Sequence, residues 1–124
     1  MSTALTFAAT ISITGDLTIT PNLGTNSYSD QDVGNYDTFI VKNDGAKLEL
    51  PKGNADYYTF VHMQTNVALS VYVNSSAGTA IPLQNVGVFS GGTGDITSLW
   101  VSNSASSTSS ATLKVIYTGK LNEA

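Results

Sequence analysis

The sequence predicts an all-β protein, an antiparallel two-sheet sandwich or jelly roll of about eight to ten short strands with little helix. Apolar residues alternate with polar ones along most of the chain, which is the period of a half-buried strand. The helical spacing of apolar residues, at i, i+3, i+4 and i+7, is hard to find over any long window. Turn residues recur every ~8–12 positions, a spacing typical of sandwiches, jelly rolls and small barrels.

The chain has the size and composition of one domain. Its 124 residues are the length of a typical single domain. Only 11% of the residues are charged, against ~25% in average soluble domains. Serine, threonine and asparagine must therefore cover most of the surface, and we expect one β-sandwich domain over residues 1–124.

The N-terminal segment is predicted to be a strand. From Leu5 to Ile13 apolar residues alternate with threonine, serine and alanine, and Gly15-Asp16 favours a tight turn into a second strand that ends at Pro21. No basic residue precedes Lys42, so the segment lacks the basic start of a signal peptide. Residues 1–10 are predicted to form an arm that contacts a partner.

A long irregular loop is predicted over residues 21–36, because glycine, asparagine and aspartate recur there. Asp30, Asp32 and Asp37 place three carboxylates in eight residues, a composition found in calcium sites. The spacing departs from an EF-hand loop, because Gly34 comes one position early and the twelfth position has no glutamate. We therefore predict a solvated acidic loop without a metal, and calcium binding is the alternative.

Later segments carry the strongest strand signals. A hairpin is predicted between Tyr36–Lys42 and Ala46–Leu50, joined by Asn43-Asp44-Gly45. The segment Tyr57–Met63 has apolar residues on both faces, so we expect a central strand that forms the core hairpin with Val67–Val73. Further strands are predicted over Thr79–Phe89, Ile96–Ser102 and Thr112–Thr118.

The residue types of nucleophilic and metal catalysis are scarce. The chain has no cysteine, and its one histidine, His62, lies in the middle of a predicted strand, where we expect a partly buried structural role. Neither a Gly-x-Ser-x-Gly elbow nor a His-Glu-x-x-His motif is present. We predict no catalytic residue, no cofactor and no enzymatic activity. A small glycosidase that uses two of the carboxylates is the last of the alternatives.

The charge of the chain argues against nucleic-acid and membrane partners. All five basic residues are lysines and the formal net charge is -4, whereas a nucleic-acid interface needs a basic patch, usually with arginine. No window approaches the ~20 apolar residues of a transmembrane helix. Lysines and prolines that would protect sheet edges are few, so we expect neighbouring subunits to cover those edges.

Two orientations are open for Trp100, which is in phase with Ile96 and out of phase with Leu99 and Val101. We expect Trp100 to face the core, because large aromatic residues are highly buried on average. If Leu99 and Val101 face the core instead, Trp100 is exposed and becomes a contact candidate.

The C-terminal third resembles small bacteriophage virion structural proteins, most of all capsid decoration (cement) proteins. The segments that carry the resemblance are Ile81–Val86, Gly94–Asn103 and Ala111–Tyr117. The resemblance implies a small β-sandwich or jelly-roll domain that forms a homo-oligomer, with a trimer favoured, on the outer capsid surface of the virion. It implies the major capsid protein as the partner and stabilisation of the shell as the function.

The sequence therefore predicts a non-enzymatic virion structural protein. Leu5 and Phe7 near the chain start, Tyr28 in the predicted loop and Trp100 are the predicted partner-binding residues, because aromatic anchors are enriched at interfaces. The alternative is a carbohydrate-binding or adhesin-like domain of a phage tail appendage, in which Trp100 or Tyr28 stacks on sugars.

Overall fold

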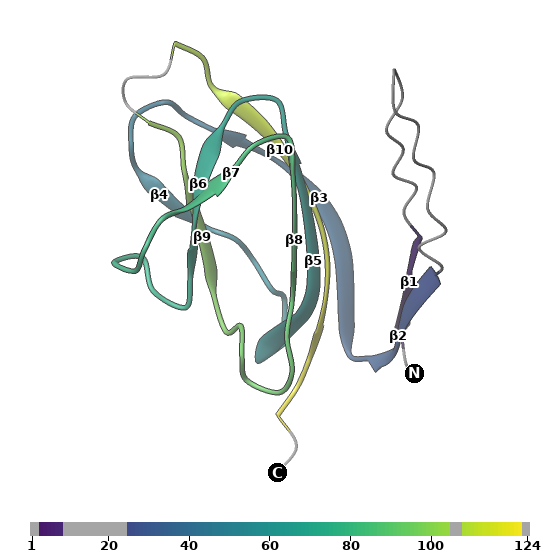
Figure 1. Cartoon of the computed structure of the whole chain (residues 1–124). Coiled ribbons are helices and arrows are strands. Elements are labelled where there is room, and N and C mark those ends of the chain that lie inside the picture. Colours follow the sequence, from purple (N-terminus) through teal and green to yellow (C-terminus); the bar gives the residue numbers. More distant parts are fainter. Residues whose placement is uncertain (1–2, 9–24, 105–107, 123–124) are drawn as a thin grey trace, which may run out of the picture.

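Ten strands and no helix make up the described part of the chain (Figure 1). The computed structural model describes residues 3–8, 25–104 and 108–122, with the side chains of residues 4–6, 31–104 and 108–122. None of these residues belongs to a helix that could span a membrane. The strands are β1 (Thr3–Ala8), β2 (Thr25–Gln31), β3 (Val33–Val41), β4 (Lys47–Glu49), β5 (Tyr57–Thr65), β6 (Leu69–Val73), β7 (Ile81–Leu83), β8 (Val86–Ser90), β9 (Leu99–Ser102) and β10 (Ala111–Lys120).

Eight of these strands form two four-stranded sheets, which we call sheet I (β3-β10-β5-β8) and sheet II (β4-β9-β6-β7). All neighbouring strands in both sheets are antiparallel. The chain changes sheet at every step from β3 to β10 except between β6 and β7. This arrangement is a jelly roll, so the predicted fold class is confirmed.

The core lies between the two sheets. Leu113 and Val115 of β10 alternate with exposed residues and face Val71, Leu99 and Val101 of sheet II; all five are at most 2% exposed. Each such side chain stabilises the fold by about 1.5–3 kcal/mol relative to an exposed position. The core is therefore built from alternate residues of both sheets, as the pattern of the sequence predicts.

The two hairpins predicted between Tyr36–Lys42 and Ala46–Leu50 and between Tyr57–Met63 and Val67–Val73 are wrong, because their strands do not pair with each other. The strands β3 and β4, and likewise β5 and β6, belong to different sheets and are not hydrogen-bonded to each other. At the β3–β4 turn, Gly45 adopts a positive φ of 76° and its N–H donates to the carbonyl of Asn103. The turn sequence therefore reverses the chain as expected, but it carries the chain across the core instead of along one sheet.

The long irregular loop predicted over 21–36 is also wrong where the structure describes it. Residues 25–31 form β2 and β3 begins at Val33, with Gly34 and Asn35 paired to Thr118 and Tyr117 of β10. Pairing with a long neighbouring strand outweighs the weak β-propensity of glycine and asparagine. Residues 9–24, with the expected Gly15-Asp16 turn, lie outside the described residues.

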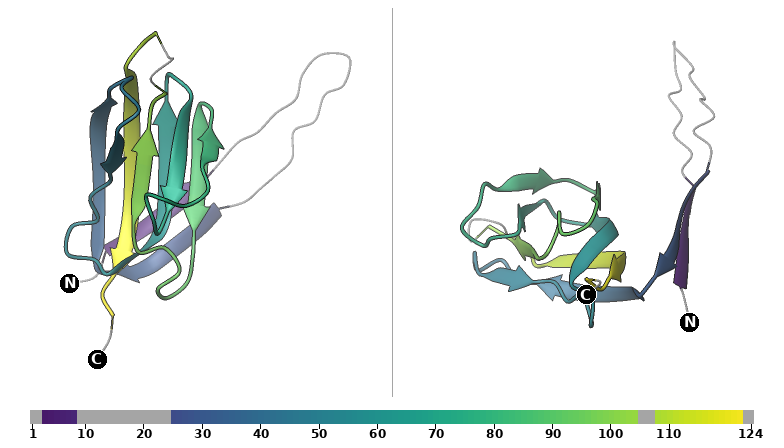
Figure 2. Two further views of the ribbon diagram at one scale, coloured as in Figure 1. Left: turned by 90° about the vertical axis from the view of Figure 1, so that its left-hand side faces the viewer. Right: turned by 90° about the horizontal axis from the view of Figure 1, so that it is seen from below.

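The ribbon of β1 and β2 stands at the side of the sandwich (Figure 2). Its two strands pair with each other and are not part of either four-stranded sheet. At its end, the buried side chain of Gln31 accepts a hydrogen bond from the hydroxyl of Thr59, which lies 2.9 Å from the Thr118 hydroxyl. Gln31 therefore fastens the ribbon to sheet I.

Tyr58 joins the core to the segment after β4. Its ring meets Tyr117 edge to face at 5.4 Å, and its hydroxyl lies 3.0 and 2.9 Å from the carbonyl oxygens of Leu50 and Pro51. Burial raises the pKa of this hydroxyl above its ordinary value, and repulsion from Tyr117 and Glu49 adds to the shift.

We expect the Tyr58→Phe variant to lose about 1–2 kcal/mol of unfolding free energy at neutral pH, because it leaves these carbonyls without their donor. In the unfolded chain a tyrosine loses its proton near pH ~10, whereas folded Tyr58 keeps it. The free energy of unfolding of the wild type therefore falls as the pH rises above ~10, by up to ~1.4 kcal/mol per pH unit from this group. Urea unfolding from pH 8 to 11 tests this, and equal slopes for wild type and variant would contradict it.

Candidate functional site

The outer face of sheet I is unusually apolar. Five large apolar side chains there are between 40% and 62% exposed: Tyr36, Ile40, Val86, Val88 and Ile116. They come from β3, β8 and β10, so they spread over both edges and the middle of the sheet. Exposed apolar side chains that gather on one face among polar residues are typical of an interaction site.

The strand register places these residues in rows. One row runs across all four strands and contains Tyr36, Ile116, His62 and Val88. The next row contains Thr38, Lys114, Gln64 and Val86, and Ile40 lies opposite Thr112 one step further. Directly opposed residues on one face have their Cβ atoms ~4.5–5.5 Å apart, so Tyr36 and Ile116 are direct neighbours. His62 and Gln64 of β5 separate this pair from the valines of β8.

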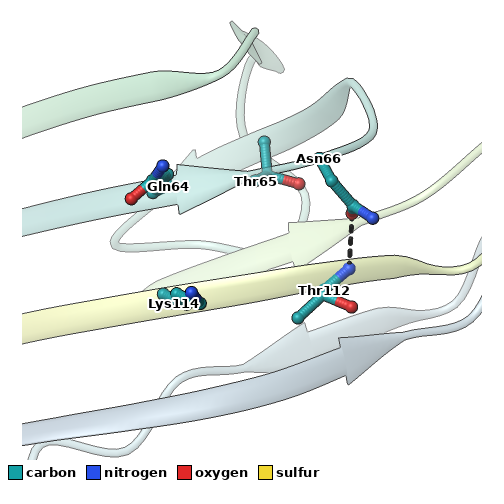
Figure 3. A pocket seen from close by; sticks show the side chains of 5 residues that line it. All are labelled: Gln64, Thr65, Asn66, Thr112 and Lys114. Atoms are coloured by element: carbon teal, nitrogen blue, oxygen red, sulfur yellow. Dashed lines mark hydrogen bonds between the residues drawn. The ribbon is translucent and has the colours of Figure 1, made fainter.

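A pocket of about 440 Å³ opens on this face next to the end of β5 (Figure 3). Gln64, Thr65, Asn66, Thr112 and Lys114 line it. The side-chain Oδ1 of Asn66 accepts the backbone N–H of Thr112 at 2.7 Å, and the Thr65 hydroxyl donates to the backbone carbonyl of Val67 at 2.7 Å. These bonds hold the rim of the pocket, while Gln64 and Lys114 lie side by side on neighbouring strands.

Lys114 gives this pocket its charge. It is the only residue with a formal charge in the rows just described, and no aspartate or glutamate occurs there. Its ammonium group makes no hydrogen bond or ion pair with the described residues. The pocket therefore combines this ammonium group with the neutral amide and hydroxyl groups of Gln64, Asn66 and Thr112.

Trp100 lies on the opposite side of the molecule. Leu99 and Val101 are fully buried, so Trp100 faces outward from sheet II, where it is half-buried between Glu49 and Tyr72. The expectation of a core position is thus wrong. Ile96 is nevertheless buried, because it precedes β9 and does not follow its alternation.

The surroundings of Trp100 leave it limited room for a ligand. The Nζ of Lys47 lies 4.2 Å from the ring centroid of Tyr72 and donates to the Ser76 carbonyl, so it covers that ring. The buried indole N–H of Trp100 has no partner among the described residues. Trp100 remains a contact candidate on a different face from the five exposed apolar residues of sheet I.

The other predicted contact residues belong to the ribbon. Leu5 is half-buried in β1 and lines a pocket of about 310 Å³ together with Ile116 and Thr118, so it lies against the outer face of sheet I. The side chains of Phe7 and Tyr28 lie outside the described part of the structure. The structure thus brings Leu5 to the apolar face and places Trp100 away from it.

The polar residues singled out in the sequence are in ordinary structural roles. His62 is half-buried in β5, as its position predicted. The carboxylate of Asp32 accepts the N–H of Leu121 at 2.8 Å, and that of Asp37 accepts a side-chain N–H of Asn35 at 3.1 Å. Among the described residues no group of three or more histidine, aspartate or glutamate side chains could hold a metal ion.

The exposed apolar residues were missed by the sequence reasoning, although a signal was present. Ile40 is followed directly by buried Val41, and Ile116 lies between buried Val115 and Tyr117. Consecutive apolar residues in a strand point to opposite faces, so such runs indicate a sheet that is apolar on both sides.

Comparison with known proteins identifies no relative. No protein-family model, no curated protein and no solved structure matches the chain.

Proposed function

We propose that the protein is a non-enzymatic virion structural protein that docks on the outside of a phage capsid as a homo-oligomer and stabilises the shell. The observation that carries the proposal is the apolar outer face of sheet I, with its five exposed large side chains. An exposed surface of this kind marks a protein interface. The resemblance of the C-terminal third to capsid decoration proteins supplies the identity of the partner, the major capsid protein.

The ribbon supports assembly into an oligomer. A two-stranded ribbon gains little stability from its own pairing, and β1 and β2 form strand pairs only with each other, with Gln31 and Leu5 among their contacts to sheet I. A neighbouring copy could cover the ribbon, and three copies closing around an axis would do so without leaving an open end. Three linked copies also bind the shell more tightly than one copy does, because their contacts form together.

The outward position of Trp100 favours a second candidate function, a carbohydrate-binding or adhesin-like domain of a tail appendage, in which the indole and not the Lys47-covered ring of Tyr72 meets the sugar. Indole and phenol rings stack on the flat apolar faces of sugars. This candidate requires glycan binding that is lost in the Trp100→Ala variant. Glycan screening without a hit would exclude it.

We expect the purified protein to be a trimer by mass measurement, to bind shells that lack it and to raise the temperature at which they rupture. The Ile40→Asp variant should bind these shells about tenfold more weakly or worse, because it places a charge in a dehydrated contact. Ile40 is 62% exposed, so the variant should fold normally. The matched control is Thr79→Asp, at an exposed position shortly before β7 of sheet II.

A monomer that ignores the shells would refute the proposal. Equal weakening by Ile40→Asp and Thr79→Asp would show that added negative charge alone reduces binding, and the outer face of sheet I would then lose its role.

A further inference from the structure

We infer that the outer face of sheet I receives an acidic surface of the major capsid protein, in which one carboxylate enters the Lys114 pocket and apolar side chains cover the exposed rows. The inference rests on the proposed function and names the chemistry that the capsid must present. It is carried by the position of Lys114, which lies in the row between Thr38 and Gln64 and next to the row of Ile116.

The charge of Lys114 decides what can cover this face. An apolar contact excludes water, and a charge without water is costly unless an opposite charge pairs with it. Lys114 has no partner among the described residues, and the rows around it contain no carboxylate. The occupant of the face must therefore bring the carboxylate itself.

The pocket offers further groups that suit a carboxylate. The two oxygens of a carboxylate accept up to about four hydrogen bonds. The Asn66 oxygen is already bonded to the backbone of Thr112, which leaves the amide N–H groups of Asn66 to donate. The Gln64 amide and the Thr112 hydroxyl line the same pocket of about 440 Å³. Neutral donor groups from these three residues thus line the pocket together with the ammonium group of Lys114 (Figure 3).

A second copy docked through the same face fits poorly. A twofold contact uses the same surface on both copies, so it would cover Lys114 of each copy with rows that contain no carboxylate. Each ammonium group would then lose water without gaining an opposite charge, which is destabilising. The partner surface is therefore not a second copy of this face, and it carries negative charge.

The outer face of sheet I is large enough to form most of a protein–protein interface. Three of its strands are nine or ten residues long and β8 has five. At ~4.8 Å between strands and ~3.3 Å per residue they cover about 500 Å². A standard protein interface buries about 800 Å² on each partner. Sheet I with its rim can therefore supply most of the contact that one subunit needs.

The test measures binding to shells that lack the protein, with wild type, Lys114→Gln, Lys114→Glu and the control Lys47→Gln. The control removes the same charge from sheet II. We expect Lys114→Gln to bind about 10- to 100-fold more weakly, because the capsid carboxylate is left buried without its partner, and Lys114→Glu to bind more weakly still. The control should bind like wild type. Circular dichroism checks that all variants are folded.

The possible results separate this inference from the proposed function. Shell binding that is lost in Ile40→Asp but unchanged in Lys114→Gln would overturn the inference and leave the proposed function standing. No binding by wild type would overturn both. Binding of a uronic-acid oligosaccharide that is lost in Lys114→Gln, while affinity for shells is unchanged, would assign the pocket to a saccharide and would also overturn the inference.

Discussion

The Leu113→Ala variant is expected to lose about 3–5 kcal/mol of unfolding free energy, which is the upper part of the range for leucine truncation in a core. Leu113 is fully buried in β10, the strand that pairs with both β3 and β5 at the centre of sheet I. Truncation removes apolar contact area and leaves a cavity that a strand held on both sides has little freedom to fill. The loss is a large share of the roughly 5–15 kcal/mol that stabilises a typical domain.

Urea unfolding of wild type and variant gives this difference directly. The matched control is Ile116→Ala on the same strand, at a position that faces outward and is 40% exposed. We expect the control to lose less than about 1 kcal/mol. Equal losses in the two variants would mean that the alternation along β10 does not separate core from surface, and the described packing would be wrong.

The fold class could be predicted because alternation is a local property of each strand. Val61 and Met63 in β5, and Leu113 and Val115 in β10, are buried at every second position. The partners of each strand could not be predicted in the same way. A turn such as Asp44-Gly45 reverses the chain, but the neighbour of the next strand is set by tertiary packing, which placed it in the other sheet.

The candidate site depended on the same missing information. Lys114 is one of five lysines, and nothing in its local sequence distinguishes it from a solvated surface residue. Only the register places Gln64 beside it and apolar residues in the adjoining row. Trp100 shows the opposite case: the two orientations could be stated from the sequence, but choosing between them required the burial of Leu99 and Val101.

Asn103 is the fully buried polar residue that holds the start of the β9–β10 connection to the rest of the fold. Its side-chain amide donates to the carbonyl oxygens of Val41, at 3.2 Å, and Ser109, at 2.8 Å. Its own backbone carbonyl accepts the N–H of Gly45. One side chain thus ties the end of β3 to the segment that precedes β10.

We expect the Asn103→Asp variant to lose about 3–5 kcal/mol of unfolding free energy at neutral pH, because it replaces a donor with a buried carboxylate that faces two carbonyl oxygens. Burial raises the pKa of the new carboxyl above the ~3.9 of the unfolded chain, so the folded state binds an extra proton at intermediate pH. The stability of the variant relative to wild type should therefore recover as the pH falls below the folded pKa towards ~4. Urea unfolding at pH 4 to 8 measures this, with Asn54→Asp at an exposed position as the control. A loss that does not change with pH would show that the carboxyl is not confined with the carbonyls of Val41 and Ser109.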